Sequence, residues 1–416
     1  MKPTYASLMT APPSALGALD ITSAEHKANP FPLYARLRDE APVLAVTVRG
    51  RQRAWLVTRY DDAVEVLKND ARFVKNPRTA MTAEQWKKAP RIPAMLQALE
   101  RNLLGLDEAD HGRLKALVHQ AFTPRTVERM RGQTETVTRE ALDRAERGRV
   151  FDLIEDFALP VPLTIIARIL GVPAEDAPRF TRWTRAFVSA GTRRHPIFAV
   201  PSILRFIGYL RGLVRARRAR PEDDLVSGLA RAQEGDDRLT DDEVLAMIFL
   251  LLSAGHETTV NLIGSGVLAL LEHPDQLALL RREPSRIKTA IEELARYVVP
   301  AEMATERYAR EDTIVAGSRI PRGEMVLAVI GSANRDPAYF DDPDRLDIAR
   351  TNNRHLSFGH GLHYCLGAPL SRMEAQIAIA MLVERAPGLR LTVAPGKLRW
   401  RPGFIVRGLE SLPVSL

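Results

Sequence analysis

Apolar residues recur at helical spacing along most of this chain. Helical patterns fill four long segments, residues 126–147, 160–171, 176–190 and 201–220. Strand patterns are short: apolar runs at 43–48 and 54–58 flank Gly50 and Arg51, which predicts a β-hairpin. We therefore expect a mostly α-helical protein with a small β region.

The longest apolar element begins at Thr240, where Thr240 and Glu243 form a capping-box signature, and continues to Leu271. Its apolar character raises the question of a membrane span. His256 and Glu257 interrupt the run before it reaches the roughly 18 continuous apolar residues that a span requires. The pattern thus favours a buried core helix, and we expect no membrane association.

One face of this helix carries small and polar residues. Leu251, Ala254, Gly255 and Thr258 follow the spacing i, i+3, i+4, i+7 and share that face. The small side chains of Ala254 and Gly255 would allow a flat cofactor to lie against the helix. Thr258 would then lie beside the cofactor, with Glu257 on the adjoining flank.

Composition is that of a globular protein with a sizeable core: 45% of the 416 residues are hydrophobic and 26% are charged. The start of the chain lacks the pattern of a signal peptide, and residues 1–18 are expected to form a loose arm. We find no internal repeat or low-complexity linker and expect one domain over residues 1–416. A cytoplasmic location is the default expectation.

The net charge of +8 raises the possibility of nucleic-acid binding. That function requires basic residues gathered in a patch with aromatic residues, whereas here aromatic residues are only 6% and the arginines are scattered. The densest cluster, Arg215 to Arg220, is expected to be a solvated helix end. We expect no nucleic acid, and the positive charge suits an acidic partner protein instead.

Cys365 is the only cysteine in the chain and is followed by a helical pattern. A thiol at a helix N-terminus is near unpaired N–H groups and the positive end of the helix dipole, so the pattern predicts a thiolate. A single cysteine excludes an internal disulfide and four-thiolate metal sites. A nucleophile, a redox centre and a haem ligand remain possible, as does a buried structural cysteine.

The segment from Phe358 to Gly367 reads Phe-Gly-x-Gly-x-His-x-Cys-x-Gly. It resembles the haem-ligand loop of the cytochrome P-450 monooxygenases. The resemblance implies a cytochrome P-450 fold, a haem b cofactor and Cys365 as the proximal iron ligand. Around the haem it assigns Phe358, Gly359, His363, Cys365 and Gly367.

The same resemblance assigns a haem propionate to His111, Lys115, Arg307 and His355. His111 and Lys115 are four residues apart and share a helix face. The family has arginine where this chain has Lys115, and an ammonium group keeps the charge but loses the bidentate geometry. A solvated helix face is the alternative for this pair.

Ala254-Gly255-x-Glu257-Thr258 resembles the oxygen-activation motif of the family. Cleaving dioxygen requires two protons without flooding the site with water, a task that suits a hydroxyl with a carboxylate nearby. By this interpretation Thr258 positions the oxygen and Glu257 relays protons. The alternative is that Thr258 caps a kink in a core helix.

Glu293 and Arg296 resemble the Glu-x-x-Arg motif of the family, which Arg345 is expected to complete as a buried structural network. Glu302 is expected at the surface. The substrate pocket is expected to be lined by residues from three segments: Leu251, Ala254, Val299, Met303, Ile405 and Val406.

The resemblance extends from about Asn29 to Leu416 and implies insertion of one atom of dioxygen into an unactivated C–H bond of a small lipophilic substrate. Gly264-Ser265-Gly266 lacks the third glycine of a dinucleotide fingerprint, so electrons are expected from a separate acidic ferredoxin-type partner. A peroxide-driven haem-thiolate enzyme and a non-catalytic haem sensor are the alternatives.

Overall fold

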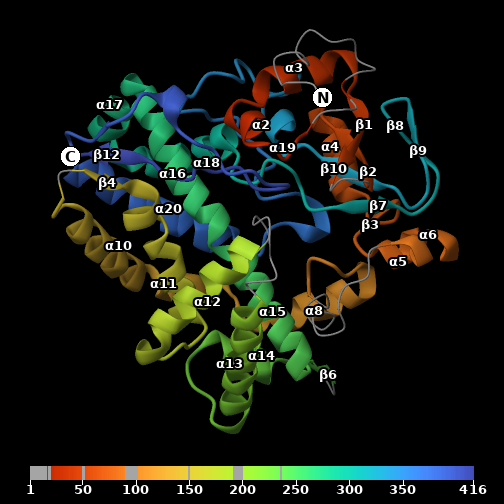
Figure 1. The fold of residues 1–416 in the computed structure, drawn as a ribbon, viewed down its shortest axis with the longest axis horizontal. Coiled ribbons are helices and arrows are strands. Elements are labelled where there is room, and N and C mark those ends of the chain that lie inside the picture. The colour runs from red at the N-terminus through yellow and green to blue at the C-terminus, as the bar shows by residue number, and fades with distance from the viewer. Residues whose placement is uncertain are drawn as a thin grey trace.

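The computed structural model describes residues 16, 20–48, 52–89, 102–148, 150–190, 200–234 and 237–416. Helices dominate, and a small sheet lies at the side of the molecule that carries the N-terminal helices (Figure 1). The expected loose arm, residues 1–18, lies outside the described residues apart from Leu16, which is buried. The prediction of a mostly helical fold with a small β region is confirmed.

The helices are α2 (Ala24–Ala28), α3 (Phe31–Glu40), α4 (Tyr60–Lys68), α5 (Pro77–Ala80), α6 (Ala83–Lys88), α8 (Glu108–Ala121), α9 (Pro124–Arg129), α10 (Arg131–Ala145), α11 (Pro160–Ile169), α12 (Ala177–Ala190), α13 (Val200–Ala219), α14 (Leu225–Arg231), α15 (Asp241–Gly255), α16 (Glu257–Glu272), α17 (Pro274–Arg282), α18 (Ile287–Val298), α19 (Ile330–Ala333) and α20 (Ala368–Arg385). The strands are β1 (Val43–Val48), β2 (Gln52–Val57), β3 (Phe73–Val74), β4 (Val150–Asp152), β5 (Gln233–Glu234), β6 (Asp237–Arg238), β7 (Arg307–Ala309), β8 (Thr313–Val315), β9 (Ser318–Ile320), β10 (Met325–Ala328), β11 (Arg390–Leu391) and β12 (Pro413–Ser415).

The largest sheet has the strand order β1-β2-β10-β7-β3. The predicted antiparallel pairing of β1 with β2 is confirmed, with Val43 opposite Val57. Strand β10 pairs parallel to β2, which joins the N-terminal hairpin to a strand more than 260 residues later in the chain. The sheet therefore fixes the segment around Arg307, on β7, against the segment around Phe73, on β3.

The long apolar element forms two helices, α15 and α16, separated at His256. The predicted capping box of Thr240 and Glu243 is present. Among the described residues, the span Asp241–Glu272, which comprises α15 and α16, is the one helical segment long and apolar enough to cross a membrane, and 67% of its apolar window is buried. Burial of this extent is that of a core helix, as the polar break predicts.

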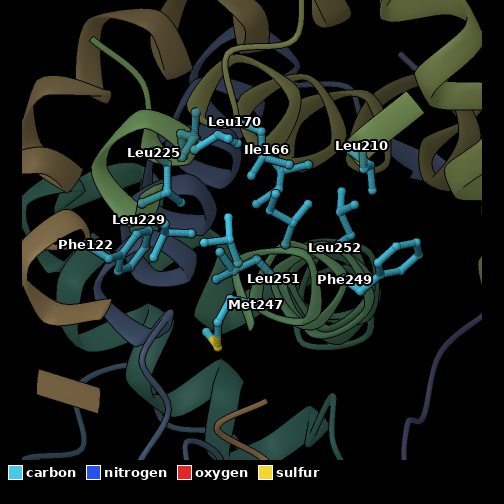
Figure 2. Close-up of a cluster of buried hydrophobic side chains, with 14 of the residues drawn as sticks. Phe122, Ile166, Leu170, Leu210, Leu225, Leu229, Met247, Phe249, Leu251 and Leu252 are labelled. Atoms are coloured by element: carbon cyan, nitrogen blue, oxygen red, sulfur yellow. The ribbon is translucent and has the colours of Figure 1, made fainter. Parts of the chain in front are cut away.

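Helix α15 packs against a hydrophobic cluster contributed by its neighbours (Figure 2). Phe122 and Leu229 approach it from one side, and Ile166 from another. Leu251 lies in this cluster and is 8% exposed. Core packing accounts for the position of Leu251, and its role in lining a substrate pocket stays a prediction.

Two expectations about charged residues are wrong. Glu302 is buried and accepts hydrogen bonds from Lys27 Nζ at 2.7 Å and His26 Nε2 at 3.0 Å. Burial raises the pKa of Glu302, but the charge of Lys27 and the bond from His26 outweigh burial and hold the pKa at about 2. Arg217, expected in a solvated helix end, is buried and paired with Asp224.

Candidate active site

The loop that carries Cys365 folds back sharply before helix α20. Gly359 and Gly361 have φ angles of +74° and +73°, which glycine adopts without the strain that other residues incur. A Cβ atom at Gly361 would also lie 2.9 Å from the carbonyl oxygen of Leu67. The backbone N–H of Cys365 donates to the carbonyl of Phe358 at 2.9 Å and closes the loop. The two glycines of the motif thus shape the backbone that presents the thiol.

Cys365 is an exposed residue, but protein atoms packed around its sulfur displace much of the water that would otherwise surround it. Burial raises the pKa of Cys365, while the N–H groups of Gly367 and Ala368 and the charge of Arg372 lower it. Burial is the largest of these effects, and the N–H groups and Arg372 offset it only in part. Coordination to a metal ion would still deprotonate the thiol, and the N–H groups would stabilise the resulting thiolate.

Arg372 of α20 supports the cysteine loop. Its guanidinium lies 4.1 Å from the centre of the Phe358 ring and pairs with Glu292 at 2.7 Å. Glu292 also contacts His355 Nε2 at 3.1 Å, so His355 is held beside the loop. Sequence analysis did not single out Glu292 or Arg372; the only signal was an arginine two helical turns after Cys365.

His111 and Lys115, four residues apart on α8, lie beside the cysteine loop. The rings of His111 and His363 are 4.4 Å apart, and Lys115 Nζ donates to the carbonyl of Leu362 at 2.9 Å. His111 is 2% exposed, and its Nδ1 atom has no hydrogen-bond partner within the described parts of the chain. An unpaired buried nitrogen is costly, so this atom is a candidate ligand contact.

Positive charge accumulates around these histidines. Arg307 is buried and donates to Asp70 at 2.6 Å and to two backbone carbonyls, which fixes it in place. Burial, and then the charge of Arg307, lower the pKa of Lys75 to about 7. Burial lowers the pKa of His363 to about 2, with further lowering from Arg307, His111, Lys75 and Lys115. Lys75, which sequence analysis missed, follows a short apolar strand and gave no further signal.

These features fit a haem group. The thiol could ligate the iron, and the ammonium groups of Lys115 and Lys75 beside His111 suit the carboxylates of a haem, since anions would relieve the repulsion between the cations. The unpaired Nδ1 of His111 offers a hydrogen-bonding position for one of them. Arg307 supplies further positive charge to the same region.

The break between α15 and α16 presents the residues of the second motif. Ala254 is exposed although it lies in a largely buried helix, and an added Cβ at Gly255 would meet only Ile166 at 3.8 Å. The hydroxyl of Thr258 donates to the carbonyl of Ala254 at 3.0 Å, which leaves the Thr258 oxygen able to accept a hydrogen bond. Burial raises the pKa of Glu257, which favours its protonated form.

A hydrogen bond joins the two motif-bearing elements. Thr259 Oγ1, next to Thr258 in α16, donates to Ser371 Oγ of α20 at 3.0 Å. Helices α16 and α20 pack against each other along this contact. The helix break is therefore held in a fixed position relative to the helix that follows Cys365.

Glu293 and Arg296 of α18 form a fully buried ion pair at 2.8 Å, as the motif predicts. The prediction that Arg345 completes this network is wrong. Arg350, not Arg345, donates to both carboxylate oxygens of Glu293 at 3.2 Å. The Arg345 side chain is exposed, and its backbone carbonyl accepts from Arg296.

The remaining pocket candidates come together from two distant segments. The N–H of Met303 lies 3.3 Å from the carbonyl of Ile405, and Ala301 pairs with Val406 in an isolated bridge. Val299, at the end of α18, and Met303 are fully buried, whereas Ile405 and Val406 are partly accessible. The two accessible residues are the better placed of the four to touch a ligand.

Comparison with known proteins identifies the family of the chain. The family model for cytochrome P450 matches residues 210–386. Polyketide biosynthesis cytochrome P450 PksS of Bacillus subtilis is 43% identical and covers 93% of this chain and 96% of the relative. The solved structure of PksS superposes with a TM-score of 0.89 at 41% identity, over 96% of this chain and 99% of that one. A further relative, 6-deoxyerythronolide B hydroxylase of Saccharopolyspora erythraea, is 39% identical over 95% of this chain and 98% of its own length. The chain therefore belongs to the cytochrome P450 family and is a cytochrome P450 monooxygenase.

Proposed function

We propose that this cytochrome P450 hydroxylates an unactivated C–H bond of a lipophilic small molecule, using haem b ligated by Cys365 and electrons from an acidic ferredoxin. One observation carries the proposal. The thiol of Cys365 precedes α20, and α20 is held by a hydrogen bond to Thr259 of α16, the residue next to Thr258. Thiolate ligation favours cleavage of the O–O bond, and a hydroxyl that can accept a hydrogen bond would help to order proton delivery to the oxygen.

Bound haem supplies the activation of dioxygen. His111 and Lys115 would hold its carboxylates, and the Thr258 oxygen, whose proton is donated to Ala254, could accept a hydrogen bond at the site. Glu257, whose pKa is raised by burial, is protonated over a wider pH range than an exposed carboxylic acid and can pass protons inward. The aliphatic surroundings of α15 limit the entry of water.

Replacing Thr258 with alanine is expected to leave haem bound while electrons are diverted to hydrogen peroxide. Loss of the hydroxyl removes the acceptor that orders proton delivery, so product formed per NADH consumed should fall by up to about 100-fold, the low end of the contribution of a positioned proton-transfer group. Peroxide and product are measured together during turnover. Thr258→Ser serves as the control that restores the hydroxyl, and unchanged coupling in Thr258→Ala would defeat the assignment.

If the partner is acidic, the turnover rate should depend on ionic strength. The chain carries a net charge of +8, and salt screens the attraction between exposed charges with a Debye length of about 8 Å at physiological ionic strength. At limiting ferredoxin the turnover rate is expected to fall as salt rises, because association slows. At saturating ferredoxin the rate should change little. A rate that is flat with salt at limiting ferredoxin would contradict an electrostatically guided partner.

The substrate class is proposed from the relatives and the pocket residues. Relatives carry the names 6-deoxyerythronolide B hydroxylase, mycinamicin IV hydroxylase/epoxidase and vitamin D(3) 25-hydroxylase. One structural neighbour, 37% identical, is a complex with a fatty acid on acyl carrier protein. A panel of macrolactones, steroids and free or carrier-linked fatty acids is therefore appropriate. A substrate is identified by the low-spin to high-spin change of the haem spectrum, followed by analysis of the product.

One experiment separates the proposal from its alternatives. The purified haem-loaded protein is given the spectrally identified substrate with ferredoxin, reductase and NADH, or with hydrogen peroxide alone. The proposal requires hydroxylated product from the electron-transfer system at a rate well above that from peroxide. Product from peroxide alone would indicate a peroxygenase, and a spectral response without product under either condition would indicate a haem sensor.

A further inference from the structure

A strained turn of the backbone follows α18 and leads into the segment that holds Met303. Val299 caps α18 with a φ angle of +47°, in the left-handed region that β-branched residues rarely adopt. Pro300 comes next, and the residue before a proline ordinarily prefers an extended conformation. Strain of this kind persists only where surrounding contacts enforce it.

Arg407 supplies such contacts on both sides of the turn. Its backbone N–H donates to the carbonyl of Pro300 at 2.9 Å, and its guanidinium donates to the carbonyl of Val298 at 3.2 Å. The same guanidinium donates to the carbonyls of Lys27 at 2.8 Å and Ala28 at 3.2 Å. These two residues end α2, and the last carbonyls of a helix lack partners within it. Arg407 therefore fastens the turn to the end of α2.

Glu302 forms a second link between the same elements. Its side chain is fully buried and accepts a hydrogen bond from Lys27 Nζ at 2.7 Å, while its backbone N–H donates to the carbonyl of Ile405 at 2.8 Å. Lys27 thus serves both links, because its carbonyl accepts from Arg407 and its ammonium group pairs with Glu302. We call Lys27, Glu302 and Arg407 the α2 anchor.

The anchored residues are direct neighbours of the predicted pocket residues. Ile405 and Val406, which are partly accessible, come directly before Arg407. Ala301 comes directly before Glu302 and pairs with Val406 in the isolated bridge. The position of Ile405 and Val406 therefore depends on the two side chains that bind α2.

The turn is also packed against the support of the cysteine loop. Val299 belongs to a hydrophobic cluster that includes Leu67 and Leu356. The carbonyl of Leu356 accepts from the N–H of Gly359 at 2.8 Å, and the carbonyl of Leu67 lies against Gly361. The anchored turn and the loop that carries the thiol thus share one packed cluster.

We propose that Lys27, Glu302 and Arg407 are positioning residues, through which α2 holds Ile405 and Val406 as a fixed wall of the substrate site. The inference rests on the proposed function, because it takes these two residues as part of the site where substrate meets the haem. Even a small outward shift of an apolar wall forfeits contacts with a ligand. Loss of the anchor should therefore change the binding of a large ligand and leave that of a small one unaltered.

The test compares two ligands that bind haem iron through the same nitrogen. The full haem-loaded chain is titrated with imidazole and with clotrimazole, an imidazole that carries bulky phenyl rings, and the shift of the haem absorption band gives both dissociation constants. The double variant Lys27→Met, Glu302→Gln removes both charges of the pair and leaves neither buried alone. The ratio of the two constants should change at least about tenfold, the low end of what one methylene group contributes in an apolar pocket.

Arg407→Lys gives a second reading that does not depend on folding of the double variant. It keeps the backbone bond to Pro300 and the positive charge but loses the planar fork, so the ratio should change in the same direction. Arg38→Lys is the matched control. Arg38 is 6% exposed, as Arg407 is, and donates to the carbonyl of Ser332 on α19 at 3.1 Å, so its loss should leave the ratio unchanged.

The outcomes separate this inference from the function on which it rests. No spectral shift with imidazole in the unaltered chain would contradict haem binding and the positioning role together. Imidazole binding with equal ratios in the unaltered chain and in both anchor variants, including no clotrimazole binding by any of them, would overturn the positioning role alone. A change in Arg38→Lys as large as that in Arg407→Lys would also overturn it, because general loss of stability would then account for both.

Discussion

Replacing Cys365 with serine is expected to abolish monooxygenase activity and the thiolate signature of the haem. The chain has no other cysteine, so no second thiol can replace the ligand. Removing a residue that only supports a metal ligand costs up to about 100-fold in activity. Removing the ligand itself should therefore cost more than about 100-fold in turnover. The reduced carbon monoxide complex should lose the spectrum of thiolate-ligated haem.

The isosteric change leaves the loop geometry intact, because the Cys365 N–H still bonds to Phe358 and the glycine conformations at Gly359 and Gly361 remain. Circular dichroism should therefore show a folded protein. Arg372→Lys is a matched variant, which keeps the positive charge near the sulfur but weakens the stacking on Phe358 and should retain the thiolate spectrum. If Cys365→Ser kept the thiolate spectrum, the ligand assignment would be wrong.

The parts of the site that could be predicted are those encoded by local spacing. The glycines around Cys365 are needed for positive φ angles within a few residues of the thiol, so the motif carries its own geometry. The polar break at His256 is also local, since it separates α15 from α16 where Thr258 bonds to Ala254. Sequence reasoning succeeds where the physical cause lies within one helical turn or one loop.

The parts that could not be predicted depend on contacts between distant segments. By sequence, Arg345 and Arg350 are equally plausible partners of Glu293. The folded backbone places the Arg350 side chain, not that of Arg345, beside Glu293. Lys75 becomes part of the cationic cluster because the sheet brings β3 beside β7. The sign of the Cys365 pKa shift is a balance between burial and nearby N–H groups, and a sequence pattern gives no measure of burial.

Replacing Glu293 with glutamine is expected to destabilise the protein by about 3–5 kcal/mol, because it leaves buried cations without their counter-charge. Glu293 is fully buried and accepts hydrogen bonds from Arg296, Arg350, Asn353 and the backbone N–H of Asp347. Glutamine keeps the shape of the side chain, but its amide nitrogen faces groups that are themselves donors. The free energy of unfolding is measured by urea titration, with haem content followed in parallel.

This network matters for function because it connects α18 to the segment before the cysteine loop. Asn334, whose carbonyl accepts from Arg296, also hydrogen bonds to Ser357 at 2.8 Å, directly before Phe358. Loss of the Glu293 charge should therefore lower haem retention as well as stability. Glu40→Gln is the matched control: both carboxylate oxygens of Glu40 accept from Arg36, and because Glu40 is exposed to water, the loss of this pair should change the free energy of unfolding little. Equal urea midpoints for Glu293→Gln and Glu40→Gln would show that burial gives the Glu293 network no special role.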